Sequence, residues 1–140
     1  MIDVSRKAKT LRTATAVATL KLKPGTIDLI RQNRIPKGDP LSVAKVAAVL
    51  AAKNTSRMIP YCHPLPIDHV DCRFQLKEDC IEVETEVKAI YKTGVEMEAL
   101  TAVSLAVLTL YDMMKMVDET MEIAGIRLLQ KKGGKSDFRE

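Results

Sequence analysis

Aromatic side chains are scarce in this chain of 140 residues, which has no tryptophan, two phenylalanines and three tyrosines. Proteins that bind single-stranded RNA usually stack bases on aromatic rings, and neither phenylalanine lies in a sequence typical of such a platform. The net charge of +4 and the sequence pI of about 9.0 still suit an anionic partner, either a nucleic acid or a phosphorylated small molecule. Charge leaves both partners open, and the shortage of aromatics makes a nucleic acid the less supported of the two.

Cysteine is also scarce, and no secretory signal is visible. Cys62, Cys72 and Cys80 are odd in number and none has CxxC spacing, so we expect reduced thiols and a cytoplasmic location. Cys62, His63 and His69 do not match a zinc-ligand spacing, so no metal site is predicted. The longest apolar run, Ala99 to Tyr111, is shorter than the roughly 20 residues that span a bilayer, so no membrane is expected.

Common catalytic and nucleotide-binding motifs are missing too, since GxSxG, HExxH and GxGxxG do not occur. The lysine- and glycine-rich tail, residues 131–140, superficially resembles a phosphate loop around Gly133 and Gly134. It fails the Walker pattern because Leu129 stands where the first glycine belongs. A flexible tail that wraps a phosphate and a simply disordered end both remain open.

Hydrophobic periodicity predicts seven elements of secondary structure, two of which are the strands of one hairpin. They are a strand over Lys9–Leu22, a short helix capped by Thr26 and running through Gln32, a helix over Leu41–Lys53, a hairpin within Ile67–Glu86, a helix from Gly94 to Lys115, and a strand over Ile123–Leu129. Asp39 is expected to cap the second helix with Pro40 at its first position. A two-residue turn would place Arg73 opposite Glu84, with Cys72 facing the core and Cys80 the other side.

The order strand, two helices, hairpin, helix, strand is typical of a ferredoxin-like α/β sandwich. We therefore predict a single α+β domain over residues 1–140, with an antiparallel sheet covered by helices on one face. The run Ala99–Tyr111 is apolar apart from Thr101, Ser104 and Thr109. A helix that is apolar on every side must be covered on every side, so we expect a second subunit against it.

Three groups of residues are candidates for chemistry. The proline-rich segment Ile59–Pro66 presents Cys62 and His63 on a stiff loop, which is either a site or a tight turn. Lys37 precedes a helix N-terminus, where it either attracts an anion or is a solvated lysine. Asp112 and Lys115 share one face at a helix C-terminus, as an acid/base pair or a structural ion pair.

Several longer segments point to one family. They are Asp3-Val4-Ser5 with Lys7, Thr10 and Arg12; Lys37-Gly38-Asp39; Ala51-Ala52-Lys53 with Thr55; Ile59-Pro60; Cys62-His63-Pro64-Leu65; Thr93 to Ala102; Tyr111-Asp112-Met113 with Lys115; and Gly133-Gly134-Lys135-Ser136. In these segments the chain resembles the MoaC family, the cyclic pyranopterin monophosphate synthases of molybdenum cofactor biosynthesis.

The resemblance implies a lyase that converts 3′,8-cyclo-7,8-dihydro-GTP into cyclic pyranopterin monophosphate and diphosphate. It also implies a homohexamer, a trimer of dimers with the site at the dimer interface, and magnesium is a possible companion of the triphosphate. The implied catalytic residues are Lys37, His63, Asp112, Lys115 and Lys131. The implied substrate contacts are Tyr61, Cys62, His63, Met97 and Glu98, with Glu96, Arg12, Lys53 and Lys135 nearby.

The chain departs from the usual family pattern at a few positions. Met114 and Met116 stand near the end of the long helix where cysteine and alanine are usual, Tyr61 where an aliphatic residue is common, and Lys132 where serine is common. None of these changes removes an implied catalytic group, so they bear on packing more than on activity. The alternative is a non-catalytic ferredoxin-like module that binds nucleotides or RNA, which the complete set of candidate catalytic residues argues against.

Overall fold

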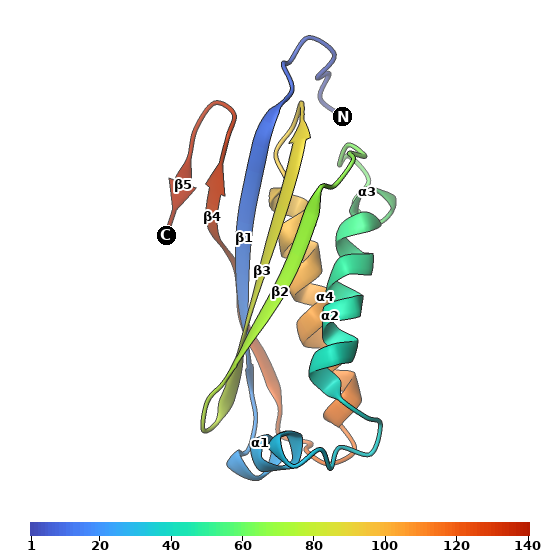
Figure 1. The fold of residues 1–140 in the computed structure, drawn as a ribbon, viewed down its shortest axis with the longest axis vertical. Coiled ribbons are helices and arrows are strands. Elements are labelled where there is room, and N and C mark those ends of the chain that lie inside the picture. Colours follow the sequence, from blue (N-terminus) through green and yellow to red (C-terminus); the bar gives the residue numbers. More distant parts are fainter.

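The computed structural model describes all 140 residues and has the predicted sandwich architecture (Figure 1). Its elements are β1 (Thr10–Lys21), α1 (Pro24–Arg31), α2 (Pro40–Lys53), α3 (Thr55–Met58), β2 (His69–Leu76), β3 (Cys80–Tyr91), α4 (Glu96–Met114), β4 (Glu122–Lys132) and β5 (Phe138–Arg139). The five strands form one antiparallel sheet in the order β2-β3-β1-β4-β5. The first four of these positions are those of a ferredoxin-like fold, which confirms the predicted fold class.

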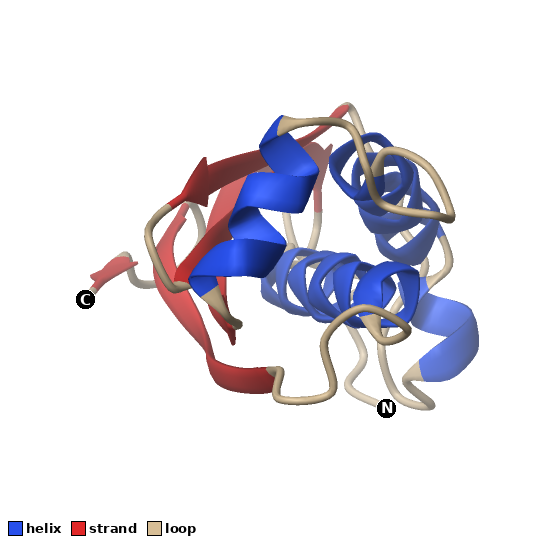
Figure 2. Cartoon of the chain, turned by 90° about the horizontal axis from the view of Figure 1, so that it is seen from below, coloured by secondary structure: helices blue, strands red, loops and turns tan.

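The helices lie on one face of the sheet, and the other face is open. Viewed from below, α2 and α4 run side by side along the sheet while α1 crosses its end (Figure 2). The side chains of β1 that face the helices are Ala14, Ala16, Ala18 and Leu20, all buried. Small alanines on the strand allow α4 to approach closely, and Thr85 of β3 donates a hydrogen bond to the Ala99 carbonyl oxygen at 2.8 Å. Burial of this polar hydroxyl is therefore compensated.

The β2–β3 hairpin has the predicted register. Arg73 pairs with Glu84 and Leu76 with Ile81. Cys72 is buried in the core, Cys80 is half-buried and all three cysteines are free. The register was predictable because alternation fixes which face is buried, while the turn length fixes the pairing.

The start of α1 differs from the prediction. Thr26 does not cap the helix, because α1 begins at Pro24 with Lys23 in the cap position. Thr26 is buried instead, and its hydroxyl donates to the Asp118 carboxylate at 2.8 Å. Asp118 also accepts from the Lys23 N–H at 3.0 Å and so supplies the missing cap from the α4–β4 turn. By contrast, Asp39 caps α2 as predicted, accepting from the main-chain N–H groups of Leu41 and Ser42.

Helix α4 is covered more completely by its own chain than we expected. Ala102 and Ala106 are fully buried between the sheet and α2. What remains outside is an apolar outer face on the two helices, with Leu108 of α4 and Val43, Val46 and Leu50 of α2 exposed by 43–60%. By length and composition α4 could cross a membrane, but half of its apolar window is buried in this fold, as in a core helix.

Candidate functional site

A cavity of about 1070 Å³ opens at the end of the molecule where α4 begins. Its lining comes from residues 1–7, the loop between α3 and β2, the first turn of α4, and the tail. Seven of the residues predicted as substrate contacts meet here, namely Tyr61, Cys62, His63, Glu96, Met97, Glu98 and Lys135. The structure thus brings together groups that lie up to 74 positions apart in the sequence.

Glu98 is the most unusual polar group of this cavity. Its side chain is 3% exposed, and burial raises the pKa of its carboxyl above the ordinary value. Oxygen Oε2 accepts a hydrogen bond from the Cys62 thiol at 3.4 Å, whereas the buried Oε1 has no partner. A buried carboxylate oxygen without a donor is costly, so this atom is well placed to accept a hydrogen bond from a ligand.

Cys62 is suited to donate that hydrogen bond and poorly suited to act as a nucleophile. Burial, together with the negative charge of Glu98, raises the pKa of its thiol to about 11. The thiol therefore remains protonated at neutral pH, and the thiolate is the reactive form. Of the two roles open to a cysteine here, the structure supports a polar contact that holds Glu98.

His63 is held by the N-terminal residues. Its Nε2 lies 2.6 Å from the main-chain carbonyl oxygen of Ile2. Pro60, Pro64 and Pro66 surround Cys62 and His63, and the segment forms neither helix nor strand, as the prolines predicted. His63 and Glu98 also line a smaller recess of about 160 Å³ next to the cavity. Lys53 and Arg57 line this recess as well.

The last predicted contact, Arg12, lies beneath the tail rather than in the cavity. Arg12 is buried, and its guanidinium donates to the carbonyl oxygens of Tyr91 and Lys92 at 3.4 and 3.3 Å. Gly133 and Gly134 cross directly over it with φ of 89° and 91°, and a Cβ on either would collide with Leu11 or Arg12. These glycines therefore allow the tail to turn back over Arg12 and bring Lys135 to the cavity.

The tail is partly built into the sheet. Lys131 and Lys132 end β4, and Lys131 pairs with Ala14 on one side and Phe138 of β5 on the other. Residues 133–137 form the connection between the two strands. The lysines of the tail lie near the same end of the sheet as the cavity. The mobility expected for the tail stays a prediction.

The remaining predicted catalytic residues form a second cluster at the opposite end of α4. Lys37 Nζ donates to the Asp112 main-chain oxygen at 3.0 Å and to its Oδ2 at 3.3 Å, and Lys115 Nζ lies 3.5 Å from Oδ1. The side chains of all three are 40–61% exposed. The hydrogen bond and charge of Lys37, aided by Lys115, lower the pKa of the Asp112 carboxyl. Asp112 and Lys115 thus share one face at the helix C-terminus, as predicted, and in the single chain both are exposed to solvent.

The two clusters are too far apart to act on one molecule within a chain. Glu98 stands in the first turn of α4 and Asp112 in its last, about 20 Å apart along the axis at 1.5 Å per residue. Of the predicted set, then, the cavity residues meet and Lys37, Asp112 and Lys115 meet, but the two groups do not meet each other.

Residues 1–7 are the largest part of the cavity lining that the site prediction missed, besides Ile59, Thr93 and Gly94. Met1, Ile2, Asp3, Val4 and Lys7 all line it. Three of them, Asp3, Val4 and Lys7, were in the segments that carry the family resemblance, and this was the signal that could have identified them.

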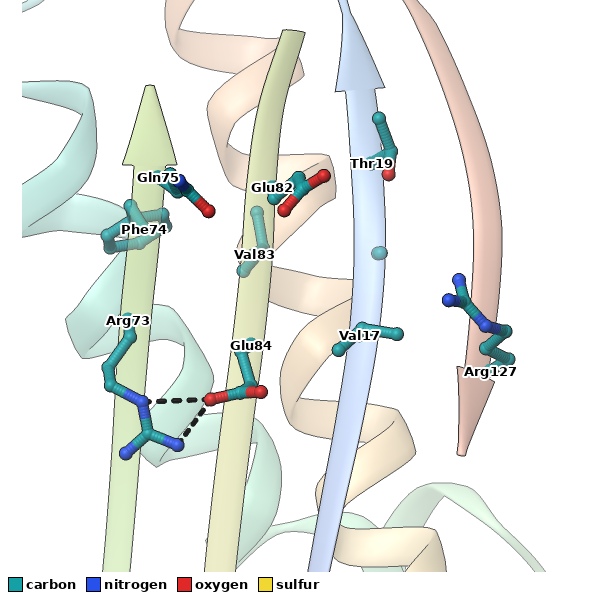
Figure 3. A pocket seen from close by; sticks show the side chains of 10 residues that line it. Val17, Thr19, Arg73, Phe74, Gln75, Glu82, Val83, Glu84 and Arg127 are labelled. Carbon is teal, nitrogen blue, oxygen red and sulfur yellow. Dashed lines mark hydrogen bonds and ion pairs between the residues drawn. The ribbon is translucent and has the colours of Figure 1, made fainter. Parts of the chain in front are cut away.

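A separate hollow of about 300 Å³ lies on the open face of the sheet (Figure 3). Arg73 is bound to Glu84 and Asp71 there, and Arg127 to Glu140. Glu82 is likewise paired, with Lys77 at 2.6 Å. Because these charges are already neutralised by neighbours, the hollow offers much less to a ligand than the cavity does. No group of three or more His, Cys, Asp or Glu side chains is arranged to hold a metal ion.

Comparison with known proteins gives a consistent result. The sequence profile described as MoaC family matches residues 1–134. The chain is 49% identical over 138 residues to a cyclic pyranopterin monophosphate synthase of Thermomicrobium roseum, covering 97% of this chain and 83% of the relative. It is 53% identical over 137 residues to the protein of the same name from Desulfitobacterium hafniense, with 97% and 84% covered. It is 49% identical over 142 residues to the cyclic pyranopterin monophosphate synthase of Thermoanaerobacter pseudethanolicus, covering 100% of this chain and 90% of the relative.

Proposed function

The chain belongs to the MoaC family, and on that premise we propose that it is a cyclic pyranopterin monophosphate synthase. The reaction converts 3′,8-cyclo-7,8-dihydroguanosine 5′-triphosphate to cyclic pyranopterin monophosphate and diphosphate, an early step of molybdenum cofactor biosynthesis. Its substrate is a phosphorylated small molecule, which suits the net charge of +4. The alternative, a non-catalytic nucleotide- or RNA-binding module, is not favoured.

The single observation that carries the proposal is the unpaired buried oxygen of Glu98 inside a cavity of about 1070 Å³. A guanine base presents N–H donors along one edge, and a carboxylate with a free oxygen is their natural acceptor. Cys62 holds the other oxygen, so the carboxylate is oriented before the substrate arrives. Glu96 and Met97 lie beside it in the same lining and complete the contacts to the base.

The cations around the cavity serve the triphosphate. Lys7 and Lys135 line the cavity itself, and Lys53 and Arg57 line the adjoining recess. Positive charge near the phosphates neutralises the diphosphate as it leaves. Lys131, whose strand leads into the tail, is assigned to the same task. Magnesium that enters with the triphosphate would rest on phosphate oxygens, since the chain gathers no ligand cluster for it.

Proton transfer is assigned to His63 on one side and to the second cluster on the other. The Asp112 carboxyl is ionised at neutral pH even at its ordinary pKa of 3.8, and Lys37 lowers that pKa further. We assign Asp112 as a proton acceptor on its position between the two lysines. Lys37 and Lys115 hold ammonium groups against it and can donate. Opening and closing a purine ring requires several such transfers, which explains why more than one acid and base is needed.

The separation of the two clusters supports a site shared between subunits. In a twofold dimer the partner's α4 can run in the opposite direction, which brings its C-terminal end to the first chain's N-terminal end. The exposed Leu108, Val43, Val46 and Leu50 on the outer face of α2 and α4 support such a contact. We further propose that three of these dimers assemble into a hexamer. We also propose a cytoplasmic location, which is consistent with three free thiols.

The proposal is tested by incubating the protein with the cyclised GTP derivative and detecting the pterin phosphate and diphosphate. Both products should form in equal amounts, and both should form about a hundredfold or more slowly with His63→Ala or Asp112→Asn. A protein that bound the substrate but released no diphosphate would be the non-catalytic module instead. Leu108→Glu should lower the assembly state in light scattering, because it places a charge in the apolar contact.

A further inference from the structure

The main-chain carbonyl oxygen of Ile2 and the imidazole of His63 form a contact that the reaction scheme above does not use. The Nε2 atom lies 2.6 Å from this oxygen, a short hydrogen bond. A carbonyl oxygen can only accept a hydrogen bond, so the ring nitrogen facing it must carry the proton and donate. No other hydrogen bond of the ring to protein is present, so Nδ1 is left without a partner.

Residues 1–7 have the structure needed to hold that oxygen in place. The Ser5 N–H donates to the Asp3 carboxylate at 2.9 Å, and the Lys7 N–H to the Val4 carbonyl at 3.0 Å. The hydrogen bonds from Ser5 lower the pKa of Asp3, and the nearby positive charge of Lys92 lowers it further. The segment therefore turns back on itself before β1 and lies across the cavity, five of its residues forming part of the wall.

We infer that residues 1–7 close the candidate cavity and that the Ile2 carbonyl is a positioning group for His63. It holds neutral His63 in the tautomer with the proton on Nε2 and leaves Nδ1 as the proton-accepting atom. This assignment rests on the proposed function for its catalytic meaning, since it names which atom of His63 takes part in proton transfer. Ring orientation and tautomer are commonly fixed in this way by a backbone carbonyl on the far nitrogen.

The alternative is that residues 1–7 are a loose end and His63 an ordinary surface histidine. Three features argue against it. The hydrogen bond is short, the segment contains its own turn, and the same residues line a cavity that also contains the buried Glu98.

The ring state of His63 can be measured without substrate, by nitrogen NMR of labelled protein. The chain has only two histidines, so a His69→Gln variant assigns the signals. At a pH where the ring is neutral, we expect a protonated Nε2, shielded from exchange with water, and an unprotonated Nδ1. Deletion of residues 2–4 should make the Nε2 proton exchange rapidly, whereas Ile2→Ala, which keeps the carbonyl, should leave it protected. A proton on Nδ1, or equal exchange in the deletion and Ile2→Ala, would overturn the inference.

A second pair of variants tests the closure itself. In His63→Gln the side-chain amide nitrogen can replace Nε2, and in His63→Ala nothing can. Hydrogen exchange of residues 1–7 should stay slow in the first variant and become fast in the second, and equal rates would refute closure. In the deletion variant kcat should fall roughly tenfold to a hundredfold, the usual effect of a misplaced catalytic group. Unaltered kcat would overturn the positioning role. Because the ring and exchange measurements need no turnover, they remain decisive even if lyase activity is not found.

Discussion

Lys37 and Asp112 come from different parts of the chain and are joined twice, through the carboxylate and through the main-chain oxygen of Asp112. The loop between α1 and α2 is thereby fastened to the end of α4. This bond lowers the pKa of Asp112, and it leaves Lys115 as the weaker partner at 3.5 Å. Asp112 and Lys115, the acid/base pair predicted from helix spacing, therefore form a trio with Lys37. Although Lys37 is more distant in sequence, it has the larger influence on the pKa of Asp112.

The trio should be catalytic and should contribute little to the stability of the fold. Its side chains are exposed, and solvent screens exposed ion pairs. Asp112→Asn and Lys37→Ala should each lower turnover by about a hundredfold or more, as the loss of a general acid or base does, while the melting temperature stays close to that of the wild type. Calorimetry and product formation on the same samples would separate the two roles. A large drop in melting temperature with proportionate activity would assign the trio to structure.

A site shared between subunits predicts that two inactive variants restore each other. His63→Ala and Asp112→Asn damage opposite halves of the site, so a mixed dimer has one fully damaged and one intact site. Random exchange at equal amounts should therefore recover about a quarter of the wild-type activity. The matched control is His63→Ala with Glu98→Gln, which damage the same half and should recover nothing. Failure of the first mixture after verified subunit exchange would place the site within one chain.

Gly133 should control the affinity for the triphosphate. Its φ of 89° and its closeness to the Leu11 carbonyl leave no room for a Cβ, so Gly133→Ala should displace the tail and withdraw Lys135. We expect KM to rise roughly tenfold, as for the loss of one charge-assisted contact, and Lys135→Ala to match it. Gly25→Ala is the control, since a Cβ there meets nothing within 4 Å. Equal KM values for Gly133→Ala and Gly25→Ala would separate the tail from substrate binding.

Asp118 should make stability depend on acid pH. Burial alone would raise the pKa of its carboxyl, but hydrogen bonds from Lys23, Thr120 and Thr26 outweigh burial and lower the pKa from 3.8 to about 2. The folded-state pKa is below the unfolded one, so the stabilisation, about 2 kcal/mol, is present above pH 3.8 and is lost as the pH falls through about 2. Urea unfolding at neutral pH should show Asp118→Ala destabilised by at least this amount, and exposed Glu119→Ala unchanged. A difference that did not shrink toward pH 3 would contradict this origin.

The elements that were predicted correctly are those whose signal is local. The β2–β3 register follows from alternation and a short turn, and the Asp39 cap is read from one residue and the proline after it. Thr26 was misassigned because its partner Asp118 is 92 positions away, and a distant carboxylate overrode the local capping preference.

The site was predictable in its residue types and unpredictable in its arrangement. The proline-rich segment and the family resemblance made Cys62, His63 and Glu98 candidates, but burial of Glu98 results from the α3–β2 loop folding over the start of α4. No local sequence pattern predicts the contact between this loop and α4. Nor could spacing reveal that Ile2, an apolar residue with no functional side chain, offers its main-chain oxygen to His63.

Helix α4 fixes the distance between the two halves of the proposed site. Its 19 residues set both the distance and the angular offset between Glu98 and Asp112. Inserting or deleting one residue would move one cluster by about 1.5 Å and rotate it by about 100° relative to the other. In the proposed shared site, a change that leaves every candidate catalytic side chain in the sequence would then destroy the register between neighbouring subunits. On the proposed arrangement, the length of this helix is therefore as much a requirement for activity as the identity of the residues at its ends.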